Sequence, residues 1–195
     1  MPDLILIILA YILGSLSSAI IICKLTGLPD PRKQGSGNPG ATNVLRFGGK
    51  KIAILVLLGD MLKGLIPVLL AKSLALPPST IAAVCLAAFL GHLYPVFFRF
   101  KGGKGVATAL GVILGLSWMA GLALIAIWLL SATLFRISSL SALIAATISP
   151  LIIWLSQPDI GYLIMSFGIS ALLIWRHKKN IRNIIQGKEP RIGKK

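Results

Sequence analysis

Long apolar runs separated by short basic connections dominate this sequence of 195 residues. A helix needs roughly 20 apolar residues to cross about 30 Å of hydrocarbon. The pattern predicts an all-α polytopic membrane protein that forms one domain over residues 1–195. The predicted spans cover residues 4–23, 52–71, 79–98, 106–117, 120–135, 140–156 and 160–175.

The uncharged run over residues 106–135 decides the number of spans. As one helix it would be about 45 Å long, so we expect two short helices that turn near residues 117–121. Lys and Arg gather in cytoplasmic loops, and with seven spans Lys72 is the only basic residue of an external connection. The sequence therefore predicts seven helices in a bacterial inner membrane, with the N-terminus periplasmic and the C-terminus cytoplasmic.

Composition supports a membrane protein and changes how its charge is interpreted. Hydrophobic residues make up 56% of the chain and charged ones 13%, whereas soluble domains hold about 25% charged residues. The net charge of +15 would favour nucleic acid in a soluble protein, but here it follows from the topology, and no nucleic-acid partner is expected. Cys23 and Cys85 lie in apolar runs without metal-type spacing, so neither a metal nor a disulfide is expected.

The first candidate site segment is GSGNPGATNVLR over residues 35–46. It contains a G-x-G-x-x-G pattern, but it lies between membrane spans rather than inside a βαβ unit, which excludes a dinucleotide fold. Backbone N–H groups in such turns can form an anion-binding concavity. The neutral or cationic groups that could bind phosphate here are Ser36, Asn38, Thr42, Asn43 and Arg46. An ordinary inter-helix loop remains the alternative.

The second segment is FKGGKGVAT over residues 100–108. It is not a Walker A loop, yet it combines glycines and lysines with the start of a helix, which is a site suited to anions. Topology anchors would explain two lysines but not the glycines between them. We expect phosphate contacts from Lys101, Gly102, Gly103, Lys104, Gly105 and Thr108.

Three ionisable residues fall inside predicted spans. Asp60 and Lys63 lie one helical turn apart, and His92 lies about one turn inside the third span. Intramembrane ionisable residues usually pair and face the bundle interior. They could support the site or serve only as a structural set.

The end of the last span carries His177, with Asn180 about one turn further along. A histidine among cations stays neutral more readily, which suits a donor or acceptor near phosphate. The short connection before the sixth span adds Ser139 and Ser141 to the same predicted side of the membrane. All of these stretches except the deeper Asp60 and His92 fall on one face in the seven-span topology, which predicts one cationic, glycine-lined pocket there.

These strings resemble the bacterial acyl-phosphate:glycerol-3-phosphate acyltransferases of the PlsY family over nearly the whole chain. The resemblance rests on residues 35–43, on Gly59-Asp60 with Lys63-Gly64, on Gly91-His92 through Thr108, and on Arg176-His177 with Asn180 and Gly187-Lys188-Glu189. It implies a seven-helix enzyme that transfers an acyl group from acyl phosphate to the sn-1 hydroxyl of glycerol 3-phosphate. The products would be lysophosphatidate, made in the first step of phospholipid synthesis, and inorganic phosphate.

The family pattern also implies roles for individual residues. Those that would contact glycerol 3-phosphate are Ser36, Arg46, Lys104, His177 and Asn180. The backbone of residues 102–105 and Thr42 would hold acyl phosphate. Similar sequences tend to have serine where this chain has Ala142, so Ser139 is a better candidate than Ser141.

The resemblance implies no cofactor, and the expected partners are both substrates, membrane lipid and, functionally, the enzyme that makes acyl phosphate. Ser36, Lys104, His177 and Asn180 are the expected catalytic set. The candidate pocket holds no carboxylate pair or Ser-His-Asp set, so direct attack on an activated donor is expected, with His177 or the substrate phosphate as base. A small phosphate transporter or channel is the alternative function, although the outer halves of the spans are almost uniformly apolar.

Overall fold

The computed structural model describes residues 2–193 and is helical in each of the predicted apolar runs. The ends of the predicted domain, Met1 and residues 194–195, lie outside the described residues. The chain forms two compact units, Met1–Leu116 and Ser117–Lys195, called here unit 1 and unit 2. Each unit is described by itself.

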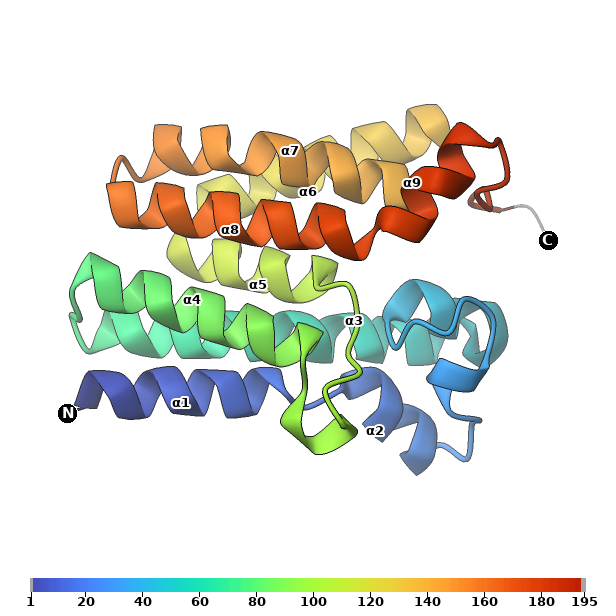
Figure 1. Ribbon diagram of the computed structural model, residues 1–195, viewed down its shortest axis with the longest axis horizontal. Coiled ribbons are helices and arrows are strands. Elements are labelled where there is room, and N and C mark those ends of the chain that lie inside the picture. The colour runs from blue at the N-terminus through green and yellow to red at the C-terminus, as the bar shows by residue number, and fades with distance from the viewer. Residues whose placement is uncertain (1, 194–195) are drawn as a thin grey trace. The chain divides into compact units, whose positions relative to one another are not determined.

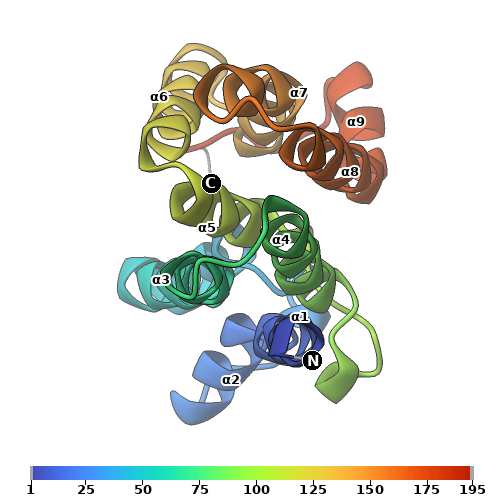
Figure 2. The same cartoon turned by 90° about the vertical axis from the view of Figure 1, so that its left-hand side faces the viewer.

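The described part of unit 1 contains five α-helices. They are α1 (Pro2–Gly14), α2 (Ser18–Leu25), α3 (Ala41–Ser73), α4 (Pro78–Leu93) and α5 (Val106–Leu116), with short 3₁₀ turns at Pro31–Lys33 and Val96–Phe98. Helix α2 continues from α1 after a bend, and α3, α4 and α5 then pass back and forth along the unit (Figure 1). Seen end-on in Figure 2, α1, α3, α4 and α5 form a bundle, in which α1 packs on α4 and α3 packs on α5. The connections that follow α2 and α4 therefore lie at the same end of unit 1.

Glycines allow the helices of unit 1 to approach closely. A Cβ added to Gly91 of α4 would collide with the Tyr11 carbonyl oxygen of α1, and one added to Gly111 of α5 would collide with the Met61 carbonyl oxygen of α3. Lipid tails are as apolar as the side chains, so membrane helices associate through such close backbone packing rather than through a hydrophobic effect.

Unit 2 contains α6 (Trp118–Phe135), α7 (Ser138–Ser156), α8 (Ile160–Arg176) and α9 (Lys178–Ile185). Helix α7 packs against both α6 and α8, and α9 contacts the ends of α7 and α8. Asp159 begins α8, because its carboxylate accepts hydrogen bonds from the backbone of Gly161 and Tyr162 at 2.8 and 3.2 Å.

The spans differ from the prediction in their ends and continuity. The run over residues 4–23 is not one helix: α1 and α2 meet at a 47° bend, where the hydroxyl of Ser17 caps α2. The predicted loop over residues 24–51 already contains residues 41–51 of α3, which include a kink at Gly49 with φ 80°. Helix α4 ends at Leu93, because Pro95 cannot continue it, and residues 96–98 form a 3₁₀ turn.

The break predicted in the run over residues 106–135 is confirmed at Ser117. Helix α5 ends at Leu116, and the Ser117 hydroxyl accepts a hydrogen bond from the backbone N–H of Ala120 at the start of α6. By length and composition four helices can cross a membrane alone, and six spans result if the bent pairs α1–α2 and α8–α9 each count as one. The 11-residue α5 is shorter, so the multi-pass fold is confirmed while seven spans remain a prediction.

Candidate active site

The first glycine-rich turn of unit 1 is held by the side chain of Asn43, in the first turn of α3. Its Oδ1 accepts a hydrogen bond from the backbone N–H of Ser36 at 2.9 Å, and its Nδ2 donates to the carbonyls of Pro31 and Gln34, both at 2.9 Å. Asn43 is 2% exposed. The Asn43 amide thus bonds backbone groups of the turn, whereas the sequence analysis expected it to contact phosphate directly.

The exposed face of this turn presents the remaining candidates. Gly35 and Gly37 have φ values of 52° and 71°, which only glycine adopts readily, and they carry the chain around Ser36. Ser36, Thr42 and Arg46 are exposed, and Asn38 is half-buried. Their polar groups lie at the N-terminus of α3, where backbone N–H groups favour anions.

Arg32, in the same connection, is occupied by an ion pair. Its guanidinium contacts the Asp30 carboxylate at 2.7 Å, and the hydrogen bond from Arg32 is the largest influence that lowers the pKa of Asp30. Asp30 therefore stays ionised at neutral pH and neutralises Arg32. Arg46 is the arginine of this connection that faces solvent without a carboxylate beside it among the described ion pairs.

The second glycine-rich segment, residues 101–105, lies directly against His92 of α4. The backbone N–H of Gly103 donates to the His92 carbonyl at 3.2 Å. A Cβ added to Gly103 would collide with the imidazole Nε2 and would lie 3.2 Å from the Pro39 carbonyl oxygen of the first turn. The two glycine-rich segments therefore meet, as expected for one site within unit 1.

The lysines and the threonine of this segment have different surroundings. Lys101 is exposed and Lys104 is half-buried, and Gly105, with φ 88°, precedes the first residue of α5. Thr108 is fully buried, and its hydroxyl donates to the Asp60 carbonyl of α3 at 2.9 Å. Thr108 therefore contributes to the packing of α5 on α3, whereas we expected it to contact phosphate together with the two lysines.

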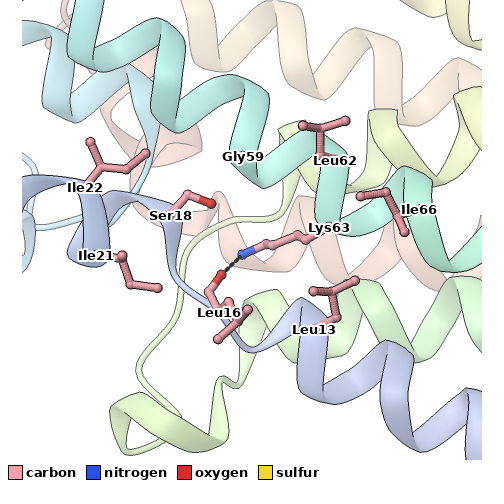
Figure 3. Close-up of a pocket in the computed structure, with 9 residues that line it drawn as sticks. All are labelled: Leu13, Leu16, Ser18, Ile21, Ile22, Gly59, Leu62, Lys63 and Ile66. Carbon is pink, nitrogen blue, oxygen red and sulfur yellow. Dashed lines mark hydrogen bonds between the residues drawn. The ribbon is translucent and has the colours of Figure 1, made fainter.

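Asp60, Lys63 and His92 form a buried cluster between α3 and α4, and each is less than 8% exposed. Lys63 Nζ lies 2.9 Å from Asp60 Oδ1, and His92 Nδ1 lies 3.7 Å from the same oxygen. Lys63 Nζ also donates to the Leu16 carbonyl at 2.6 Å, at the break between α1 and α2 (Figure 3). The Asp60 carboxylate of α3 thus lies near His92 of α4, and through Lys63 it is linked to the break between α1 and α2. His92 in turn contacts the segment over residues 101–105.

A hollow of about 280 Å³ lies beside this break, and its lining residues are drawn in Figure 3. Apart from Ser18 and the stem of Lys63, its lining is aliphatic or glycine: Leu13, Leu16, Ile21, Ile22, Gly59, Leu62 and Ile66. The Lys63 ammonium is already bonded to Leu16 and Asp60. The hollow thus suits hydrocarbon rather than a phosphate.

In unit 2 two of the candidates, Ser139 and Asn180, contact Glu189, a residue that the sequence analysis did not single out as part of the site. Its Oε1 accepts hydrogen bonds from Ser139 Oγ and Asn180 Nδ2, both at 2.6 Å, and its Oε2 accepts one from Asn183 Nδ2 at 3.2 Å. A carboxylate thus joins candidates of this unit, although the sequence analysis named Glu189 only in the motif that carries the family resemblance. The available signal was that Glu189 is the one acidic residue in a tail with eight Lys and Arg residues.

His177 lies at the junction of α8 and α9 and is 2% exposed. Its Nδ1 is 2.8 Å from the Leu173 carbonyl oxygen. A carbonyl can only accept, so Nδ1 carries a proton and donates to Leu173. Ser141, in contrast, is fully buried, and its hydroxyl donates to the Ile137 carbonyl of its own helix.

Residues 2–193 hold no group of three or more His, Cys, Asp or Glu side chains able to bind a metal ion. The site candidates are instead glycine backbone, amides, hydroxyls, imidazoles and cations, a set suited to phosphate oxygens.

The fold and these residues define a multi-pass membrane protein with glycine-rich, cationic turns. The sequence profile of the family described as "Glycerol-3-phosphate acyltransferase" matches residues 4–187. The chain belongs to this family, in its PlsY branch.

Individual relatives agree with this assignment. The chain is 60% identical to a glycerol-3-phosphate acyltransferase of Thioalkalivibrio sulfidiphilus, over 97% of this chain and 94% of the relative, and 57% identical to one of Methylococcus capsulatus, over 97% and 96%. Two crystal structures of PlsY (YgiH), an integral membrane glycerol 3-phosphate acyltransferase, share its fold. The glycerol 3-phosphate form has a TM-score of 0.95 at 44% identity, and the lysophosphatidic acid form 0.93 at 43%; both comparisons cover 99% of this chain and 96% of the other.

Proposed function

We propose that this chain transfers an acyl group from acyl phosphate to the sn-1 hydroxyl of glycerol 3-phosphate, which gives lysophosphatidate and inorganic phosphate. Its relatives are named for glycerol 3-phosphate acylation, and two similar structures are of glycerol 3-phosphate and lysophosphatidic acid forms. The observation that carries the proposal is the contact between the two glycine-rich segments of unit 1 at Pro39 and Gly103. It offers backbone N–H groups and lysines for more than one phosphate.

The proposed reaction is a direct acyl transfer. The sn-1 oxygen attacks the acyl carbonyl, the bond from that carbon to the phosphate oxygen breaks, and the hydroxyl proton leaves to a base. Phosphate is already a good leaving group, so the protein contributes mainly position and charge stabilisation. The catalytic residues would be Ser36 and Lys104 of unit 1 and His177 and Asn180 of unit 2.

The base in this scheme is either His177, through its Nε2, or a phosphate oxygen of glycerol 3-phosphate. Glu189 is a poor candidate, because its oxygens already accept three hydrogen bonds from Ser139, Asn180 and Asn183. Near-normal turnover of His177→Ala at saturating substrate would assign the role to the substrate.

The remaining candidates have binding roles in this proposal. Arg46 would contact the phosphate of glycerol 3-phosphate, whereas Thr42 and the backbone of residues 102–105 would hold acyl phosphate. Asn43 would act through the turn that it holds, and Ser139 through Glu189. We further propose that the reaction takes place on the cytoplasmic side of the inner membrane, in a seven-span protein with its N-terminus outside, which would keep the basic connections inside.

Donor choice tests the proposal. Purified protein is given glycerol 3-phosphate with palmitoyl phosphate, palmitoyl-CoA or palmitoyl-acyl carrier protein, and the product is analysed for the acylated position. We expect 1-acyl product from palmitoyl phosphate alone. Product formed as fast from either thioester would overturn the assignment of the donor, and a 2-acyl product would overturn that of the hydroxyl.

A further inference from the structure

The segment over residues 101–105 lies close to the buried carboxylate of Asp60, with one side chain between them. The imidazole of His92 stands between the two: its Nδ1 is 3.7 Å from Asp60 Oδ1, and its Nε2 occupies the space that a Cβ on Gly103 would need. The ring thus has a buried charge near one of its nitrogens and the glycine backbone near the other. Any tilt of the ring changes the position of Gly103.

The backbone strengthens the same link. The His92 carbonyl accepts the hydrogen bond from Gly103 N–H, and a Cβ on Gly102 would collide with that carbonyl and lie 2.6 Å from the carbonyl of Leu93. Two successive glycines therefore lie flat on the last turn of α4. Only glycines fit here, because any larger residue would push the segment away from His92.

The other end of the segment is also fixed to Asp60. Gly105 leads directly into α5, where the Thr108 hydroxyl donates to the Asp60 backbone carbonyl at 2.9 Å. A Cβ on Gly64, one turn further along α3, would collide with the Thr108 carbonyl. One turn of α3 thus contacts both flanks of the segment, through His92 before it and through Thr108 after it.

We propose that Asp60 is a positioning residue for the phosphate-binding segment 101–105 and that its carboxylate acts through the His92 ring. At 3.7 Å the carboxylate acts on the Nδ1 edge of the ring through its charge rather than through a hydrogen bond, which favours one ring plane and directs Nε2 towards Gly103. Lys63 balances the charge of Asp60 at 2.9 Å, so the carboxylate can stay ionised although it is buried. This role rests on the proposed function, since it concerns the segment assigned there to acyl phosphate.

The test is the variant Asp60→Asn in the full-length protein, assayed with both substrates. It keeps the size of the side chain and the Asp60 carbonyl that Thr108 uses, and it removes the charge facing His92. We expect the KM for acyl phosphate to rise about tenfold, with kcat and the KM for glycerol 3-phosphate changed by less than about twofold. KM does not depend on how much of the protein is folded, so a purely structural defect would lower the maximal rate and leave both KM values unchanged.

Two comparisons make the result specific. Asp159→Asn, the same change at a capping residue of α8 outside the proposed machinery, should leave all constants at wild-type values, since Asn also caps helices. His92→Asn should raise the KM for acyl phosphate as much as Asp60→Asn does, and the double variant should be no worse than either single one. If Asp60→Asn does not accumulate, His92→Asn alone decides.

An unchanged KM for acyl phosphate in Asp60→Asn or in His92→Asn, or additive effects in the double variant, would overturn the positioning role. Failure of the proposed function has a different signature, because the wild-type protein would then make no lysophosphatidate from acyl phosphate.

Discussion

At the residue scale, two polar side chains among the candidate segments form hydrogen bonds to other protein groups and so shape the site. Asn43 bonds three backbone groups of the first turn, and Glu189 collects three side chains of unit 2. The groups left to face a substrate in unit 1 are glycine backbone and exposed side chains such as Ser36 and Arg46. Binding thus depends on residues that shape the turns as much as on those that would touch phosphate.

The turn around Ser36 gives the prediction at this scale. Asn43→Asp keeps the size of the side chain and one acceptor for the Ser36 N–H, but its carboxylate faces the Pro31 and Gln34 carbonyls without a donor. Lost bonds of this kind cost about 1–3 kcal/mol each, so we expect the turn to shift and the KM for glycerol 3-phosphate to rise about tenfold. Steady-state kinetics measure it.

The matched control is Gln186→Glu, the same amide-to-acid change on an exposed side chain. It should bind glycerol 3-phosphate as the wild type does. A wild-type KM in Asn43→Asp would show that the turn does not depend on these two hydrogen bonds.

At the element scale, the hydrophobic pattern predicted where helices occur better than where they break. Ser117 was found because a run of thirty apolar residues is too long for one span. The bend after Gly14 and the kink at Gly49 were missed, because the residues on both sides of each break keep the same apolar or amphipathic character. The role of Glu189 was missed for another reason: although it is the one acidic residue of the basic tail, its contact with Ser139 joins residues 50 positions apart, and spacing along the chain does not reveal such a contact.

The bend between α1 and α2 gives the prediction at this scale. Lys63→Met removes the donor to the Leu16 carbonyl and leaves Asp60 as a buried charge without its cation. Breaking a buried ion pair from one side costs about 3–5 kcal/mol, so we expect a clearly lower midpoint of thermal unfolding. Differential scanning measurements on the purified protein in detergent give this midpoint.

Lys72→Met is the matched control. Lys72 Nζ donates to the Leu116 carbonyl at 2.8 Å, a bond of the same kind at a helix end, and among the described ion pairs it faces no carboxylate. Its loss should lower the midpoint much less, since one such hydrogen bond contributes about 1 kcal/mol. Equal shifts in the two variants would mean that the Asp60 pair contributes nothing beyond the carbonyl bond.

At the scale of the whole molecule, the family and its multi-pass character are established, and the topology is the part still proposed. Among the described residues, four helices are long and apolar enough to cross a membrane, and six spans result if each bent pair counts as one. Helix α5 is apolar but shorter than these. Eleven residues rise about 16 Å as an α-helix, roughly half of the hydrocarbon thickness. Whether α5 counts as a span decides on which side the basic tail ends.

Reporter fusions test the topology. With seven spans, alkaline phosphatase fused after the last residue stays inactive and a green fluorescent protein fused there is fluorescent, because the C-terminus is cytoplasmic. The same pair inserted between α3 and α4, at residues 74–77, should give the opposite result. An active phosphatase at the C-terminus would contradict seven spans and leave an even number.

The central claim is tested most directly in proteoliposomes that contain the purified protein. They are given palmitoyl phosphate and radiolabelled glycerol 3-phosphate, and labelled lysophosphatidate and released phosphate are counted in one time course. Direct acyl transfer predicts one lysophosphatidate for each phosphate released, with both substrates required. Label that accumulates inside the vesicles while no lysophosphatidate forms would contradict it and favour an anion transporter.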